Sequence, residues 1–212
     1  MYIPKKFQHD NLNDIQDLVH EFPLATIVTS NSGNIEACHV PLYLEFVDDN
    51  IILYGHLAKV NPLLKSQLHD NKWLVIFQDM GHYISPNWYP NKIVTHKEVP
   101  TWNYRSVHFT VKPMFITEFD ELKSIISKLS EIHEQIEPMP WSINHAPEKF
   151  IESMCKAIVG IRLTVLDIQS QFKLSQNKDA KTKENVATQL RKIGSTNAQK
   201  MAENIGKYND KK

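Results

Sequence analysis

The chain has 212 residues, and its 24 Lys and Arg residues equal its 24 Asp and Glu residues, so its formal net charge at pH 7 is zero. A neutral chain gives no electrostatic case for general binding to nucleic acid or to membrane surfaces. The length allows one large domain, or a domain with a helical appendage, and no apolar run approaches the roughly 20 residues of a membrane-spanning helix.

The first part of the chain predicts one helix and then three strands that follow each other closely. Apolar residues recur at helical spacing between Asp10, a plausible N-cap, and Glu21. The tetrapeptide NSGN at 31–34 is a hairpin signal, and Pro41 indicates an edge or a bulge. Strands in such close succession are typical of a meander or a barrel. The predicted strands are Leu24–Ser30, Ile35–Phe46 and Ile51–His56.

The middle of the chain predicts a short helix and further strands. The helix extends from Ala58 to His69, with Pro62 in its first turn. The segment Lys72–Gln78 is apolar enough for a strand that is buried on both faces. After a long loop, Arg105–Thr117 forms one or two strands.

Two helices and one last strand are predicted after this sheet. Thr117 and Asp120 resemble a capping box before a clean amphipathic helix. Pro147 begins a short helix that ends at Cys155. The segment Ile158–Ile168 is the last predicted strand.

The C-terminal segment predicts two short helices that end at Gly194 and Gly206 and carry thin apolar stripes. Basic residues outnumber acidic ones from Lys173 onward. We therefore predict a mainly β protein with helices, an α+β fold, in which residues 1–177 form a barrel domain and residues 178–212 form a basic helical tail.

The loop Gly81–Tyr104 has an unusual composition for a connection between strands. It contains two Trp, three Tyr, two His and three Pro, and it shows neither helical nor strand periodicity. Aromatic rings with polar tips suit a flat ligand or a partner subunit, while a hydrophobic cluster that anchors a long loop remains the alternative.

Several common site signatures are missing. The six glycines form neither GxGxxG nor GxxxxGK[ST], and neither GxSxG nor HExxH occurs. The ten histidines show no ligand spacing, so we expect no metal site, and we assign no catalytic residue. Cys38 and His39 are adjacent in a strand and face opposite sides. Cys38 and Cys155 form no CxxC and no leader precedes them, so we expect a reduced, cytoplasmic protein.

The turn from His56 to Asn61 is the clearest candidate for an anion site. A strand ends there, and His56, Lys59 and the first amides of the next element are able to converge on one anion. Without further context, a strand-to-helix turn with solvated charges is the better explanation of these residues.

Seven segments together resemble the PaiB-type family of FMN-binding negative transcriptional regulators, within the flavin split-barrel superfamily. The likeness covers residues 1 to about 177, and ISPNWYP, PTWNY and KLSQN are its most specific parts. It implies a homodimer of antiparallel Greek-key split barrels with FMN in a cleft between subunits. The segments are PLATIVTS, HVPLYLEF, GHLAKVNP, FQDMGHYISPNWYP, VPTWNY, IVGIRLTVLDI and FKLSQN.

The resemblance implies a set of FMN-binding residues, with Lys59 as the first phosphate contact. The family commonly has Arg there, and Lys supplies a point charge without a bidentate fork. Phe172 stands where the family often has Trp, which weakens a stacking role at that position. The full set is Thr26, Thr29, His56, Lys59, Asn61, Tyr83, Ser85, Trp88, Thr101, Trp102, Asn103, Lys173, Ser175 and Gln176.

Three functions remain open from the sequence. The first is a flavin-binding dimeric regulator, although no helix-turn-helix is evident and DNA contact through the basic tail follows from the family likeness alone. The second is a flavin-dependent oxidoreductase of the pyridoxamine-phosphate oxidase-like kind, in which the cofactor supplies the chemistry. The third is a haem-binding or haem-degrading split-barrel protein.

Overall fold

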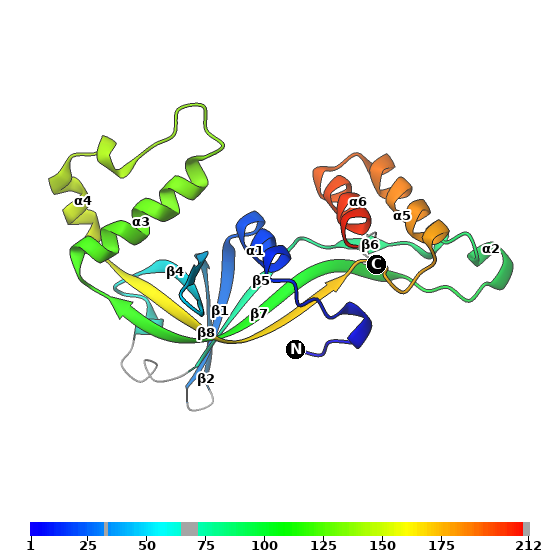
Figure 1. The fold of residues 1–212 in the computed structure, drawn as a ribbon, viewed down its shortest axis with the longest axis horizontal. Coiled ribbons are helices and arrows are strands. Elements are labelled where there is room, and N and C mark those ends of the chain that lie inside the picture. The colour runs from blue at the N-terminus through cyan, green and yellow to red at the C-terminus, as the bar shows by residue number, and fades with distance from the viewer. Residues whose placement is uncertain (32–33, 65–71, 210–212) are drawn as a thin grey trace. The chain divides into compact units, whose positions relative to one another are not determined.

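The computed structural model describes residues 1–31, 34–64 and 72–209. Its chain divides into two compact units (Figure 1). Unit 1 consists of Met1–Leu18, Gln78–Val107 and Gln169–Lys212, and unit 2 consists of Val19–Phe77 and His108–Ile168. Each unit is described by itself.

One sheet contains the strands of the chain, in the order β2-β1-β5-β7-β8-β4-β3, with β6 paired to β7. Pairing is antiparallel between β1 and β2, β1 and β5, β3 and β4, β4 and β8, and β6 and β7. The strands are β1 Leu24–Asn31, β2 Asn34–Pro41, β3 Tyr43–Val47, β4 Asn50–Ala58, β5 Trp73–Gln78, β6 His82–Ile84, β7 Thr101–Ile116 and β8 Ile158–Lys173.

The helices are α1 Leu12–Glu21, α2 Lys92–Thr95, α3 Phe119–Glu134, α4 Glu148–Cys155, α5 Ala180–Ile193 and α6 Thr196–Asn209. Antiparallel strands with separate helices confirm the predicted α+β class. Within the described residues, no helix is long and apolar enough to cross a membrane.

The predicted strand Ile35–Phe46 is in fact two strands, because the chain changes partners at Leu42. β2 pairs with β1, whereas β3 pairs with β4. The backbone N–H of Leu42 donates to the carbonyl oxygen of Pro23 at 2.9 Å, which continues the β1–β2 register by one position. Pro23 has no N–H to donate back to Leu42, so the pairing ends there, and β2 is an edge strand as Pro41 indicated.

The expected helix Ala58–His69 is wrong over its first residues. β4 continues to Ala58, and one 3-10 turn follows at Pro62–Leu64. Residues 65–71 of that expectation lie outside the described part of the chain. The prediction that Lys72–Gln78 is buried on both faces is also wrong. In β5, Trp73, Val75 and Phe77 are buried, while the residues between and after them are half-buried or exposed.

Two predicted helix caps and one predicted helix end are also wrong. Asn11, not Asp10, caps α1, because its side-chain oxygen accepts the N–H of Asp14 at 3.1 Å. α3 begins after Glu118 without a side-chain cap, so the capping box at Thr117 does not form. Gly194 ends α5 with φ 75°, but α6 continues through Gly206 to Asn209.

Unit 2 has its own apolar cluster beneath α3 and α4. Tyr43 of β3 and Ile116 of β7 are buried together with Leu122, Ile125 and Ile151 of the two helices. Helix α3 also contacts β4. The cluster therefore fixes the end of β4, and with it the turn that carries Lys59, against the start of α3.

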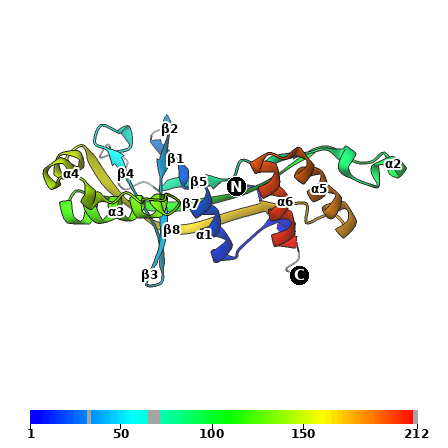
Figure 2. The ribbon, with the colours of Figure 1, turned by 90° about the horizontal axis from the view of Figure 1, so that it is seen from above.

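Unit 1 packs α5 and α6 side by side, as Figures 1 and 2 both show. Their thin apolar stripes are buried, including Val186 and Leu190 of α5 and Met201 of α6. Asn185 donates to the carbonyl oxygen of Trp88 at 2.6 Å, and Asn197 donates to that of Gly81 at 2.8 Å. The segment that we predicted to be a tail thus packs on the aromatic loop within one compact unit.

Candidate functional site

The residues singled out in the sequence fall into two groups, one in each unit. Unit 2 contains Thr26, Thr29, His56, Lys59 and Asn61. Unit 1 contains Tyr83, Ser85, Trp88, Thr101, Trp102, Asn103, Lys173, Ser175 and Gln176. Each unit has a cavity that some of these residues line.

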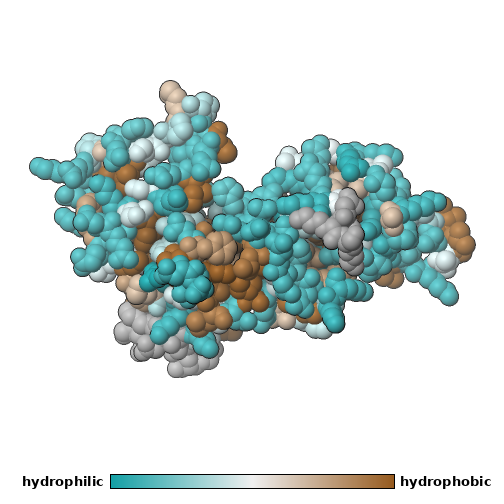
Figure 3. All heavy atoms as spheres, in the orientation of Figure 1, coloured by the Kyte–Doolittle hydropathy of each residue, from teal (hydrophilic) through white to brown (hydrophobic). Residues whose placement is uncertain are grey.

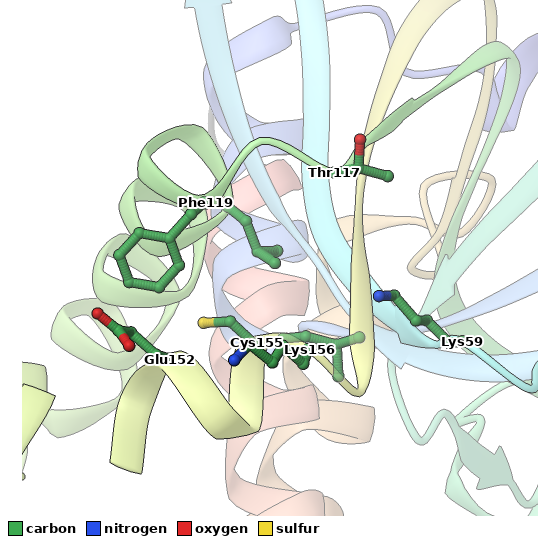
Figure 4. A pocket seen from close by; sticks show the side chains of 8 residues that line it. Lys59, Thr117, Phe119, Glu152, Cys155 and Lys156 are labelled. Atoms are coloured by element: carbon green, nitrogen blue, oxygen red, sulfur yellow. The ribbon is translucent and has the colours of Figure 1, made fainter. Parts of the chain in front are cut away.

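The cavity of unit 2 has a volume of about 240 Å³ and lies beside the turn after β4. Two lysines line it: Lys59 lies in the turn, and Lys156 directly follows α4 (Figure 4). The hydroxyl-bearing Thr117 lies before α3 on its rim. Glu152 lines the same cavity with a carboxylate. The remaining lining is apolar, from Phe119, Leu122, Cys155 and Ile158.

Backbone hydrogen bonds fix the position of Lys59. Its N–H donates to the carbonyl oxygen of Ala157 at 2.9 Å, while the N–H of Asn61 donates to that of Ala58 at 2.8 Å. The side-chain oxygen of Asn61 accepts the N–H of Leu63 at 2.9 Å. The backbone turn is therefore fixed, and the exposed Lys59 side chain remains available to a ligand.

His56 has an unsatisfied polar atom near the same turn. Burial lowers the pKa of its imidazole, which favours the neutral ring. Its Nδ1 is buried and has no hydrogen-bond partner among the described residues. A buried polar atom without a partner is uncommon in native proteins and fits a group that binds to a ligand.

The other residues of the unit 2 group do not form one surface with Lys59. Thr29 is buried and Thr26 is half-buried. Because the two threonines are three positions apart in β1, their side chains point to opposite faces of the sheet. Asn61 also forms a hydrogen bond with the Cys38 side chain, which partly opposes the rise that burial causes in the pKa of that thiol.

The cavity of unit 1 has a volume of about 290 Å³ and collects residues from three distant segments of the sequence. Four predicted site residues line it, two from the PTWNY motif and two from KLSQN. The whole lining consists of Lys6, Phe7, Tyr89, Glu98, Val99, Pro100, Thr101, Asn103, Lys173, Ser175, Asn177 and Lys178.

Hydrogen bonds join the two motifs at this cavity. The ammonium of Lys173 donates to the hydroxyl oxygen of Thr101 at 2.6 Å. The amide nitrogen of Asn103 donates to the hydroxyl oxygen of Ser175 at 2.9 Å, and both residues are almost fully buried. On another side, the ammonium of Lys178 lies 2.6 Å from the Glu98 carboxylate.

Ser175 adopts the left-handed backbone conformation, with φ 64°. This conformation costs a residue other than glycine on the order of 1 to 3 kcal/mol, and such residues cluster at functional sites. Gln176 supports the turn, because its side-chain oxygen accepts the N–H of Leu174 at 2.7 Å and its amide nitrogen donates to the Phe172 carbonyl oxygen. Gln176 thus shapes the turn and does not line the cavity.

The remaining unit 1 residues belong to the aromatic loop. Tyr83 and Trp102 are opposite each other in the β6–β7 pair, and their ring centroids are 6.2 Å apart. Their exposed fractions are 44% and 54%. Ser85 caps the 3-10 turn Pro86–Trp88 by accepting the N–H of Asn87. Trp88 is half-buried, and its carbonyl oxygen accepts the hydrogen bond from Asn185 of α5.

Apolar exposure in unit 1 extends to the tip of the aromatic loop. Ile93 and Val94 of α2 are 82% and 81% exposed, and Figure 3 shows apolar residues where α2 lies in Figure 1. Tyr89, in contrast, is buried within the unit. Tyr89 therefore needs no partner subunit to cover it.

Sequence reasoning missed several lining residues. Lys6 and Lys178 line the unit 1 cavity, and Thr117 and Lys156 line the unit 2 cavity. Their positions depend on contacts between distant segments, so no local pattern marks them. Across the residues that the structure covers, no group of three or more His, Cys, Asp or Glu residues is placed to hold a metal ion.

Low-identity likenesses to solved structures show the fold. The chain superposes on the FAD and heme binding protein from Mycobacterium smegmatis with a TM-score of 0.57 at 16% identity, covering 85% of this chain and 79% of that one. The flavocytochrome Anf3 from Azotobacter vinelandii gives a TM-score of 0.58 at 13% identity, covering 81% and 72%. These superpositions confirm the predicted antiparallel split-barrel fold.

Sequence comparisons show the family. Residues 1–167 match the family model described as "Putative FMN-binding domain". The "Protease synthase and sporulation protein PAI 2" of Bacillus subtilis is 37% identical over 203 residues, which cover 96% of this chain and 95% of that protein. An uncharacterized protein of Saccharomyces cerevisiae is 32% identical over 170 residues, covering 71% of this chain and 100% of that protein. The chain therefore belongs to the PaiB-type family of FMN-binding split-barrel proteins, as the motifs in its sequence predict.

Proposed function

We propose that this chain binds FMN and that the turn after β4 holds the FMN phosphate, with Lys59 as the first contact. The observation that carries the proposal is the unit 2 cavity, where Lys59, Lys156 and the Thr117 hydroxyl line one space. Two ammonium groups and a hydroxyl suit a phosphate monoester, which has a charge of about −1.5 to −2 at pH 7. The unpartnered Nδ1 of His56 lies on the strand that leads into this turn.

The family supports FMN as the ligand, because the matching model describes an FMN-binding domain and covers this turn. The bound flavin would supply the redox chemistry and the visible absorption. The residues of the chain would bind and orient it. Tyr83 and Trp102 offer exposed ring faces, which suit a flat ring system or a second subunit.

We further propose that the protein acts as a homodimeric negative regulator of transcription. Support comes from membership in the PaiB-type family and from the exposed apolar side chains of the aromatic loop. The α5–α6 segment is the candidate contact for DNA, since Lys181, Arg191 and Lys192 are exposed there. This contact would be electrostatic and therefore sensitive to salt.

Two measurements test the proposal. The visible spectrum of the protein after incubation with FMN and removal of free ligand should show bound flavin in a ratio near one per chain. The protein should retain labelled promoter DNA, and unlabelled DNA of the same sequence should displace it. This retention should weaken as the salt concentration rises. A chain that retains flavin but no DNA, and that oxidises NADPH in its presence, would replace the regulator with a flavin enzyme. Absence of flavin retention would reject the ligand itself.

A further inference from the structure

The unit 1 cavity contains more positive charge than its own acid neutralises. Three lysines and one glutamate line it. Glu98 pairs with Lys178, whose ammonium also lies 4.4 Å from the centre of the Tyr89 ring. Neither Lys6 nor Lys173 forms an ion pair with any residue that the structure describes. Two positive charges therefore remain without a counter-charge.

These two lysines contact the same aromatic ring. Both ammonium groups lie over the ring of Phe7, at 5.1 Å from its centre for Lys6 and 5.9 Å for Lys173. Burial lowers the pKa of Lys173, and the charge of Lys6 lowers it further. Repulsion between like charges in a partly buried cavity destabilises the folded chain, and a bound anion offsets this repulsion.

Neutral hydrogen-bonding groups form the base of the same cavity. Asn103 and Ser175 are 1% and 4% exposed, and they are bonded to each other. The Thr101 hydroxyl accepts from Lys173, so its own proton is available to an acceptor in the cavity. The site thus combines two unneutralised cations with hydroxyl and amide groups that are held in place.

We propose that this cavity binds a second anion, a small phosphate monoester, separately from the FMN at the turn after β4. Two positive charges match the charge of a phosphate monoester at neutral pH. Lysines act on phosphate as point charges, and Lys6 and Lys173 supply two of them to this cavity.

The size and walls of the cavity define the ligand further. Its volume, about 290 Å³, is at the lower end of the range for small-molecule pockets, about 300 to 1,000 Å³. Phe7 and Tyr89 provide aromatic walls next to the lysines. The ligand is therefore compact, with an apolar or aromatic part that is no larger than one ring. The proposal rests on the proposed function in one respect, that the FMN phosphate is held at the turn after β4 and not in this cavity.

Phenyl phosphate is a suitable probe, with inorganic phosphate and phenol as its separate parts. Calorimetric titration into the full chain saturated with FMN, so that the turn after β4 is occupied, should show saturable binding of phenyl phosphate at one site per chain, and weaker binding of inorganic phosphate. Lys6→Gln and Lys173→Gln should each weaken phenyl phosphate by about tenfold or more, the loss of one charge-assisted contact. Lys173→Arg should retain most of the affinity.

Two matched variants distinguish this site from general surface attraction and from the turn after β4. Lys97→Gln removes from the same unit an exposed charge that does not line the cavity, and it should leave phenyl phosphate binding unchanged. Lys59→Ala should also leave it unchanged, so failure at one cavity is distinguishable from failure at the other. Lys6 is exposed, so Lys6→Gln provides the test even where Lys173→Gln does not fold.

Three results would overturn the proposal. The first is the absence of saturable binding by phenyl phosphate to the parent protein. The second is an equal loss of affinity in Lys97→Gln, which would show general surface attraction. The third is loss of all phenyl phosphate binding when the chain is saturated with FMN but not with riboflavin, which would show that phenyl phosphate occupies only the site of the flavin phosphate.

Discussion

Replacement of Lys59 by alanine tests the proposed phosphate site most directly. The substitution removes one ammonium group from the unit 2 cavity and leaves the backbone bond from residue 59 to Ala157 in place. A hydrogen bond to a charged group contributes roughly 1.5 to 3 kcal/mol. Because Lys59 is exposed, solvent screens its charge, and we expect the lower end of this range. About 1.5 kcal/mol corresponds to a loss of about tenfold in affinity for FMN.

Riboflavin provides the internal control, because it has the same ring system and no phosphate. Titration by flavin fluorescence should show that Lys59→Ala weakens FMN about tenfold and leaves riboflavin unchanged. Lys156→Ala should weaken FMN in the same direction, since Lys156 lines the same cavity. Lys112→Ala removes an exposed charge elsewhere in unit 2 and should leave both ligands unaffected.

The pattern of losses distinguishes a phosphate contact from a structural role. Equal losses for FMN and riboflavin in Lys59→Ala would refute the assignment, because the deleted contact does not exist for riboflavin. A lower melting temperature without a change in the ratio of the two affinities would also count against it. Higher salt should reduce the difference between the ligands in the parent protein, as expected for an exposed ion pair.

Three further predictions concern pH, assembly and the C-terminal segment. The pKa of His56 is lower in the folded chain than its ordinary value of about 6.5. Between these two pKa values the unfolded chain binds more protons than the folded chain. The free energy of unfolding should therefore fall as the pH falls through this window. His56→Gln should reduce that slope in denaturant titrations, and an unchanged slope would exclude His56 as its source. Sedimentation should show a dimer at micromolar concentration, with an interface above about 2,000 Å² if the dimer is obligate, and Trp102→Ser should favour the monomer. A stable monomer of the parent protein would contradict this. Because α5 and α6 pack on the aromatic loop within unit 1, limited proteolysis should leave residues 178–212 intact for as long as the rest of that unit, whereas early cleavage confined to residues 178–212 would show a separable tail.

The sequence alone determined the class of the fold and the family. Periodicity of two and of 3.6 residues is a local property, and it located most strands and helices, including α3 and β1. The motifs PTWNY and KLSQN were specific enough to indicate the PaiB-type family. Gly194 marked the end of α5 because a left-handed residue after a helix favours glycine.

Only the tertiary structure decided which residues share a cavity. Lys6, Glu98 and Lys173 are far apart in the sequence and meet because β7 and β8 are neighbours in the sheet. The partner change at Leu42 and the burial of Tyr89 also depend on long-range packing. Local patterns record which face of an element is apolar, but they contain no information on which distant element covers it. For that reason the sequence named Thr101, Asn103, Lys173 and Ser175, while the structure joined them and added the lysines that set the charge.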